Sequence, residues 1–145
     1  DWTMAQPRIS PARLDTALVG LRLAIGGIFA AHGAQKLFVY GLDGVSGAFA
    51  GMGIPMASVV GPLTGAIELV GGLALIAGLL TRIAGLGLAA VMLGAIGFVH
   101  LSAGFWAPNG VEFPLALLAG AATIALVGAG RYSLDTVLAM RRSTR

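Results

Sequence analysis

The stretch MASVVGPLTGAIELVGGLALIAGLL, residues 56–80, carries one charged side chain, Glu68, in an otherwise apolar run. A helix needs roughly 20 apolar residues to cross the hydrocarbon core of a bilayer, and this run is long enough. Three further runs, at about 16–39, 83–107 and 111–130, share its length and its glycine-dotted apolar character. The sequence therefore predicts an all-α, polytopic membrane protein built as a four-transmembrane-helix bundle.

The composition of the chain supports this class and excludes others. Of its 145 residues, 57% are hydrophobic and 10% are charged, whereas soluble domains carry about 25% charged residues. The 23 glycines indicate close packing between helices, because small residues let backbones approach each other in lipid. The absence of cysteine excludes disulfides, iron–sulfur ligation and thiol redox pairs within this chain.

The apolar runs divide the chain into three parts. Residues 1–14 form a polar N-terminal lead-in, 15–131 the four-helix membrane domain, and 132–145 a basic cytoplasmic tail. Asp15 or Thr16 is expected to cap the first helix. Residues 41–55, GLDGVSGAFAGMGIP, are too glycine-rich for a span and too apolar for a free loop. They predict a re-entrant or interfacial segment between the first two helices.

The basic residues predict how the bundle is oriented. Lys36 is expected at one side of the membrane, and seven arginines at the other: Arg8, Arg13, Arg82, Arg131, Arg141, Arg142 and Arg145. Positive residues collect at the cytoplasmic face, so both termini should be cytoplasmic, in a bacterial inner membrane. These charges flank apolar spans, which argues against nucleic-acid binding. The expected partners are the lipid bilayer and other membrane subunits or further copies of the chain.

Ionisable side chains inside the apolar runs mark the candidate site, because charge at membrane depth is costly and often functional. At a rise of about 1.5 Å per residue, four of them should share a level near the outer surface: His32, Lys36, His100 and Glu112. Glu68 should lie below them and Arg22 lower still. One small-and-polar helix face is expected to present Glu68 toward the first helix: Gly61, Thr64, Gly65, Glu68 and Gly72.

Each of these residues has a candidate role and a structural alternative. Glu68 is the candidate proton relay, or else a structural ion-pair partner of Arg22 or Lys36. His32 and His100 are the other catalytic candidates, or else buried histidines held by hydrogen bonds. The candidate ligand-binding residues are Lys36, Arg22, Phe29, Trp106 and Glu112. Arg22 and Lys36 could instead extend to the membrane surfaces, and Glu112 could offset a helix dipole.

No metal site is expected, although two alternatives stay open. The first is a metal held by His32, His100 and Glu112. The second is a haem or another pigment held between the two histidines.

Several short motifs in order give the chain its resemblance to a known family. They are Arg22, HGAQKL at 32–37, GMGIP at 51–55, ELVGG at 68–72, GLLTR at 78–82, His100, GVE at 110–112 and GRYSLD at 130–135. Over about residues 15–136 this pattern resembles the DoxX family of small four-helix membrane proteins. The resemblance implies a link to membrane redox systems, since related chains form membrane subunits of thiosulfate:quinone oxidoreductase.

The leading hypothesis is therefore an integral membrane subunit of a redox-linked assembly that interacts with quinone through a polar pocket near the outer face. If the chain is catalytic, it should act as an oxidoreductase subunit with quinone. One alternative is a non-catalytic structural, scaffolding or assembly subunit. A second is a small-solute carrier, for which four helices are few and no strong inverted repeat is visible.

Overall fold

The structure, a computed structural model, describes residues 8–145, and every regular element in that range is helical. The predicted all-α class is thus confirmed for the described residues. In chain order the elements are α1 (Pro11–Ala34), η1 (Gln35–Tyr40), α2 (Gly41–Gly51), α3 (Ala57–Ala77), α4 (Thr81–Ala95), η2 (Ile96–His100), η3 (Leu101–Ala103), α5 (Glu112–Val127) and α6 (Leu134–Ser143). Of these, η1 and η2 are π-helical turns and η3 is a short 3-10 turn.

Three helical stretches are long and apolar enough to cross a membrane: Pro11–Gly51, Ala57–Ala77 and Thr81–Ala103. The fourth predicted span is occupied by α5, which is apolar but has only 16 residues. Such a helix rises about 24 Å, which is less than the roughly 30 Å of a bilayer core. The structure therefore supports a membrane protein with three long apolar helices and one shorter one.

The first helix begins earlier than expected. Pro11 starts α1, and the side chain of Ser10 caps it by accepting a hydrogen bond from Arg13 N at 3.3 Å. The prediction that Asp15 or Thr16 caps this helix is therefore wrong, since both lie within it. Proline at the first helical position is favourable because its missing N–H would have no partner there. Residues 1–7 of the predicted lead-in lie outside the described residues.

The glycine-rich segment after the first helix is itself a helix. The chain bends at Gly41, whose φ of 74° is accessible to glycine, and then forms the 11-residue α2. Val45 of α2 is fully buried and packs against α3 at Gly61, where an added Cβ would lie 3.1 Å from the carbonyl oxygen of Val45. Where the sequence predicted a re-entrant or interfacial segment, the structure has a short helix packed on α3.

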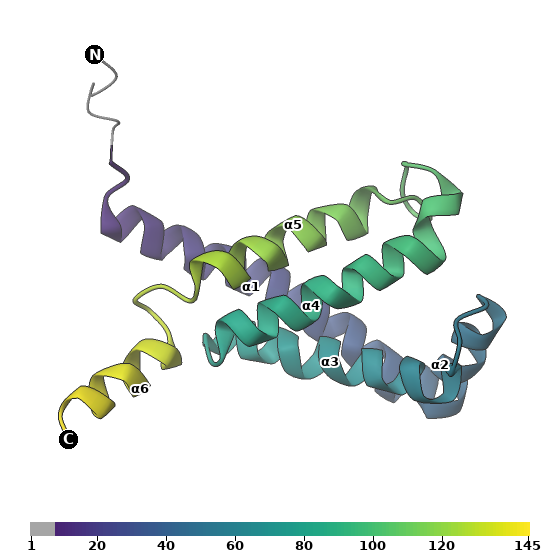
Figure 1. The fold of residues 1–145 in the computed structure, drawn as a ribbon, viewed down its shortest axis with the longest axis horizontal. Helices are drawn as coiled ribbons and strands as arrows, with labels where there is room; N and C mark the ends of the chain where they lie inside the picture. The colour runs from purple at the N-terminus through teal and green to yellow at the C-terminus, as the bar shows by residue number, and fades with distance from the viewer. Residues whose placement is uncertain (1–7) are drawn as a thin grey trace, which may run out of the picture.

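Successive long helices run in opposite directions, as the short connections require (Figure 1). The start of α1 and the whole of α6 lie at one end of the molecule, which we call the α6 end. Helix α2 and the connection 101–111 lie at the opposite end, the α2 end. Helices α1 and α3 pack against each other, as do α4 and α5, and the two pairs diverge toward the α2 end (Figure 1).

The contact between α1 and α3 depends on glycine. An added Cβ on Gly72 would lie 2.6 Å from the carbonyl oxygen of Gly26, and one on Gly26 would lie 2.7 Å from that of Gly72. No side chain fits at that distance, so the two backbones touch directly. In a bilayer such close approach replaces the hydrophobic effect as the source of helix association. The same contact places the first π-helical turn, η1, against the middle of α3.

Candidate functional site

A cavity of about 670 Å³ opens at the α2 end, between the α1–α3 pair and the α4–α5 pair. We call it the α2-end cavity. Its walls are largely apolar and include four phenylalanines: Phe29, Phe49, Phe98 and Phe113. Its polar lining residues are His32, Lys36, Thr64, Glu68 and His100. Five of the eight residues predicted as site residues therefore line one cavity: Phe29, His32, Lys36, Glu68 and His100.

Glu68 pairs with Lys36 at the edge of this cavity. Lys36 Nζ donates to Glu68 Oε2 at 2.6 Å, and the Glu68 side chain is 4% exposed while that of Lys36 is 19% exposed. Helix α3 does present Glu68 toward α1, as predicted from its small-and-polar face. Of the two cations proposed as partners, Lys36 makes the ion pair and Arg22 does not. The two elements are close at this point, since an added Cβ on Gly65 would lie 3.1 Å from the Cβ of Lys36.

The Lys36–Glu68 pair keeps unused hydrogen-bonding capacity. An ammonium has three donors, and Lys36 uses one of them on Glu68. Within residues 8–145, Glu68 Oε1 has no hydrogen-bond partner. Because both residues line the cavity, a ligand there could bind the remaining donors and the free carboxylate oxygen.

His100 lies at the end of η2, on the far wall of the cavity. Its Nδ1 is 2.8 Å from the carbonyl oxygen of Asn109, which belongs to the connection between α4 and α5. The side chain is half-buried. This bond fixes the ring against the connection and leaves its other nitrogen available.

Both π-helical turns of the described chain carry a polar cavity residue. Lys36 belongs to η1 and His100 to η2. A π-helical turn inserts an extra residue per turn and rotates the side chains that follow, and such turns are frequent at functional sites. The sequence carries no signal for them, so reasoning from ideal helical spacing could only place these residues by approximate depth.

His32 contributes less than predicted to the cavity wall. Its side chain is exposed, and its ring lies 6.1 Å from that of Phe113 in a tilted arrangement at 46°. The contact links α1 to α5, and both residues line the cavity. Of the two lining residues, His32 is thus exposed, whereas Glu68 is buried.

The other predicted ligand-binding residues lie elsewhere. Trp106 is 77% exposed and packs edge-on against Phe105, with ring centroids 5.1 Å apart. Glu112 begins α5 and does not line the cavity. Among residues 8–145, no three His, Asp or Glu side chains gather closely enough to hold a metal ion. The structure therefore does not bring His32, His100 and Glu112 together as a ligand set.

Arg22 lies toward the α6 end, away from the α2-end cavity. It is 3% exposed, and its guanidinium donates to four backbone carbonyl oxygens: Leu75 at 2.9 Å, Ile76 at 3.2 Å, Ala129 at 2.6 Å and Tyr132 at 3.0 Å. These carbonyls belong to the last turn of α3 and to the connection between α5 and α6. The prediction of Arg22 as a ligand-binding residue is not supported by this position, because its donors are used to hold helices together.

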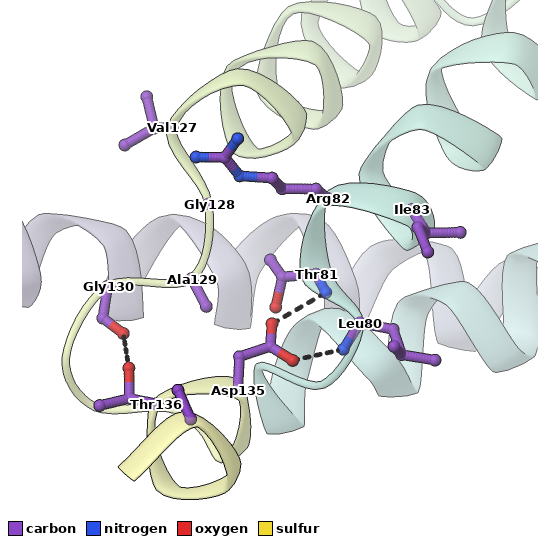
Figure 2. Close-up of a pocket in the computed structure, with 11 residues that line it drawn as sticks. Leu80, Thr81, Arg82, Ile83, Val127, Gly128, Ala129, Gly130, Asp135 and Thr136 are labelled. Atoms are coloured by element: carbon purple, nitrogen blue, oxygen red, sulfur yellow. Dashed lines mark hydrogen bonds between the residues drawn. The ribbon is translucent and has the colours of Figure 1, made fainter. Parts of the chain in front are cut away.

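Asp135, which reasoning from the sequence named only as the end of the GRYSLD motif and not as a site residue, joins α6 to the start of α4. Figure 2 shows its carboxylate between the two elements, accepting from Leu80 N at 2.7 Å and Thr81 N at 3.0 Å. Thr136 donates to the Gly130 carbonyl oxygen at 3.0 Å (Figure 2). These residues border a second, shallow pocket of about 500 Å³. Together with Arg22, they form what we call the α6-end network.

The charge of Asp135 is stabilised by its partners. Burial alone would raise the pKa of Asp135, but the hydrogen bonds from Thr81 and Leu80 and the positive charge of Arg22 outweigh burial. Together they hold this pKa below its ordinary value of 3.8. The signal in the sequence is Ser133, which caps α6 and places Asp135 in its first turn. That signal predicts a helix start but gives no hint of the partner helix.

Comparisons with known proteins match most of the chain. The sequence model of the DoxX family matches residues 17–101, a range that includes Lys36, Glu68 and His100. The "Uncharacterized membrane protein Rv3486" of Mycobacterium tuberculosis (strain ATCC 25618 / H37Rv) is 34% identical over 146 residues, covering 93% of this chain and 89% of that protein. The "Putative oxidoreductase CatD" of Bacillus subtilis (strain 168) is 37% identical over 115 residues, covering 79% and 81%. No solved structure matches the chain significantly.

Proposed function

Since this chain belongs to the DoxX family, we propose that it is a membrane subunit of a redox-linked assembly and that its α2-end cavity binds quinone. The observation that carries this proposal is the Lys36–Glu68 pair, which opens onto an otherwise apolar cavity. A buried ion pair with free donors and acceptors suits a ligand that is mostly apolar but has polar oxygens. The name of the Bacillus subtilis relative agrees with a redox role.

The dimensions and chemistry of the cavity fit a quinone head group. Its volume of about 670 Å³ lies within the roughly 300–1,000 Å³ typical of small-molecule sites. Phe29, Phe98 and Phe113 can pack against the faces and edges of a flat ring. The remaining donors of Lys36 suit a ring oxygen.

The residues of the cavity then have distinct tasks. A quinone supplies two-electron, two-proton chemistry when bound. Lys36 donates to a ring oxygen and orients the head group, while Glu68 Oε1 takes up or returns a proton at that oxygen. The apolar walls exclude water and so strengthen these interactions. Because the chain has no cysteine, thiol or iron–sulfur electron carriers would have to belong to a partner subunit.

We propose that the α2 end faces the outside of a bacterial inner membrane and that both termini are cytoplasmic. The α6 end carries the arginines that flank the long helices and α6, among them Arg13, Arg82, Arg131, Arg141 and Arg142, whereas Lys36 lies toward the α2 end. This distribution follows the positive-inside rule. In this arrangement α5 is the fourth span, and the quinone site lies near the outer surface.

Quinone content of the purified protein tests the proposal. The chain is extracted in mild detergent, and bound quinone is quantified after solvent extraction. We expect close to one quinone per wild-type chain and a clear decrease in Glu68→Gln, because the free carboxylate is lost. Glu112→Gln is the matched control, since Glu112 is a carboxylate at the same end that does not line the cavity. Equal quinone content in all three proteins would contradict the proposal.

A structural role is the second candidate, and one observation favours it. Lys36 and Glu68 neutralise each other, so the pair could serve only to fix α1 against α3. This role predicts that the purified protein carries no quinone and is recovered only together with partner subunits. The same extraction experiment therefore separates the two candidates.

A further inference from the structure

The hydrogen bond between His100 and Asn109 determines which ring nitrogen carries the proton. A backbone carbonyl oxygen can only accept, so His100 Nδ1, 2.8 Å from it, must be the donor. A neutral imidazole has a single N–H. In the neutral ring, Nε2 therefore has a free lone pair and acts as an acceptor.

The carbonyl that imposes this tautomer is itself fixed in place. Asn109 lies in a connection closed by three backbone hydrogen bonds: Gly110 N to Trp106 O at 2.8 Å, Val111 N to Gly104 O at 2.9 Å and Glu112 N to Phe105 O at 2.9 Å. The carbonyl of Asn109 therefore acts as a positioning group for His100. Within residues 8–145, His100 Nε2 has no hydrogen-bond partner, and the residue lines the cavity.

Resting on the quinone site proposed above, we propose that His100 Nε2 accepts a hydrogen bond from a ring hydroxyl, so that the cavity binds the reduced quinol more tightly than the quinone. A quinone presents only carbonyl oxygens, whose lone pairs would face the lone pair of Nε2. A quinol presents hydroxyl groups, which donate to Nε2 and still accept from Lys36. The selected ligand class is thus an apolar ring that bears a hydroxyl group.

Glu68 is a second acceptor in the same cavity, and the experiment must separate it from His100. Two substitutions do so. His100→Asn places an amide N–H where Nδ1 stands, which keeps a donor for the Asn109 carbonyl but removes the acceptor at Nε2. His100→Gln reaches farther and places an amide oxygen near the Nε2 position, which restores an acceptor.

The experiment measures binding of one short-tailed quinol, kept reduced without oxygen, and of the corresponding quinone, to the purified full chain stripped of endogenous quinone. For the wild type we expect the quinol to bind about tenfold more tightly. One hydrogen bond contributes roughly a three- to tenfold factor, so His100→Asn should lose most of the preference. His100→Gln should recover part of it. A folded His100→Asn protein is recognised by its unchanged thermal unfolding midpoint.

The outcomes separate this inference from the function on which it rests. Equal affinity of the wild type for quinol and quinone would overturn the acceptor assignment while leaving the quinone site intact. A preference that persists in His100→Asn would assign it to another acceptor of the cavity, Glu68, His32 or Thr64, and also overturn the inference. Binding of neither ligand to the wild type would overturn both the inference and the proposed function.

Discussion

The α6-end network and the α2-end cavity both contain buried charge, but they differ in how much hydrogen-bonding capacity is left. Arg22 uses four of its five N–H donors on backbone carbonyls. Lys36 uses one of three donors on Glu68, whose second oxygen has no partner within residues 8–145. Arg22 thus has one donor left and, within residues 8–145, Thr81 Oγ1 is the one fully buried side-chain polar atom without a partner, whereas the Lys36–Glu68 pair keeps two donors and a carboxylate oxygen and opens onto the larger cavity.

The comparison changes how a charged residue in an apolar helix should be interpreted. Charge at membrane depth is usually taken as a sign of function. Taken as whole residues, Arg22 and Glu68 are equally buried, at 3% exposed each, and burial does not distinguish them. What distinguishes the two residues is the number of hydrogen-bond donors and acceptors that they and their partners leave unused. Substitutions at the α6 end should therefore reduce stability, and those in the cavity should reduce ligand binding.

The largest expected loss of stability follows from Arg22→Gln. Buried carbonyls left without a donor cost roughly 1–3 kcal/mol each, and glutamine can replace few of the four bonds. We expect the free energy of unfolding to fall by about 3 kcal/mol or more, measured by thermal or denaturant unfolding in detergent. Arg13→Gln, at an exposed position of the same helix, is the control. Equal stability of the two variants would show that Arg22 does not have this structural role.

A smaller loss is expected from Gly33→Ala, which tests the helix contact that holds the cavity. An added Cβ would lie 2.7 Å from the Gly65 carbonyl oxygen, so α1 and α3 must separate. Overpacking of this kind costs about 1–3 kcal/mol. Because Lys36 follows within one turn, quinone content should fall as well. Gly27→Ala is the control, since nothing lies within 4 Å of its Cβ position. Identical behaviour of the two variants would contradict the close contact.

Asp135→Asn should cost about 1 kcal/mol, because a charged carboxylate accepts hydrogen bonds more strongly than a neutral amide oxygen and the amide replaces only one of its two oxygens. Because the pKa of Asp135 is held below 3.8 in the folded protein, its contribution is present above that pH and is lost as the pH falls through the folded pKa. The stability difference between wild type and Asp135→Asn should therefore shrink between about pH 5 and about pH 3. Unfolding curves at several pH values measure it. A stability difference between the two proteins that grows as the pH falls would contradict this prediction.

The smallest effect on stability is expected from the double variant Lys36→Leu with Glu68→Met. Replacing a buried ion pair by apolar residues of similar size is often neutral or stabilising, so the unfolding free energy should change by less than about 1 kcal/mol. Quinone content should nevertheless be lost. The single variant Glu68→Met should be less stable than the double, because Lys36 is left unpaired. Strong destabilisation of the double variant would show that the Lys36–Glu68 pair has a structural role. The contrast between the α6-end network and the α2-end cavity would then be weaker.

Parts of this arrangement follow from sequence patterns, and parts do not. The apolar runs predict the long helices, and the small residues around Glu68 predict the face that meets α1. The choice of Lys36 over Arg22 as the partner of Glu68 could not be predicted, because it depends on the exact axial match of two helices and on the π-helical turn η1. The apolar run at about 111–130 also predicted a longer helix than the 16 residues of α5.

The α6-end network was harder to anticipate than the cavity. Asp135 bonds to residues 54 and 55 positions away, and Asp15 accepts from Arg131 N, 116 positions away. Local patterns carry no information about such partners. A carboxylate near a helix start is a typical cap, which is why Asp15 was predicted as one. In the structure Ser10 caps α1.

The partners of Arg22 have a consequence for biosynthesis. Two of its four carbonyl partners, Ala129 and Tyr132, lie 107 and 110 residues later in the chain. A ribosome therefore delivers the arginine of the first helix long before two of the four carbonyls that bind it exist. Until residue 132 has been translated, the guanidinium has only the carbonyls of Leu75 and Ile76 among its final partners. The complete set of Arg22 contacts can therefore form only after the C-terminal segment has been made.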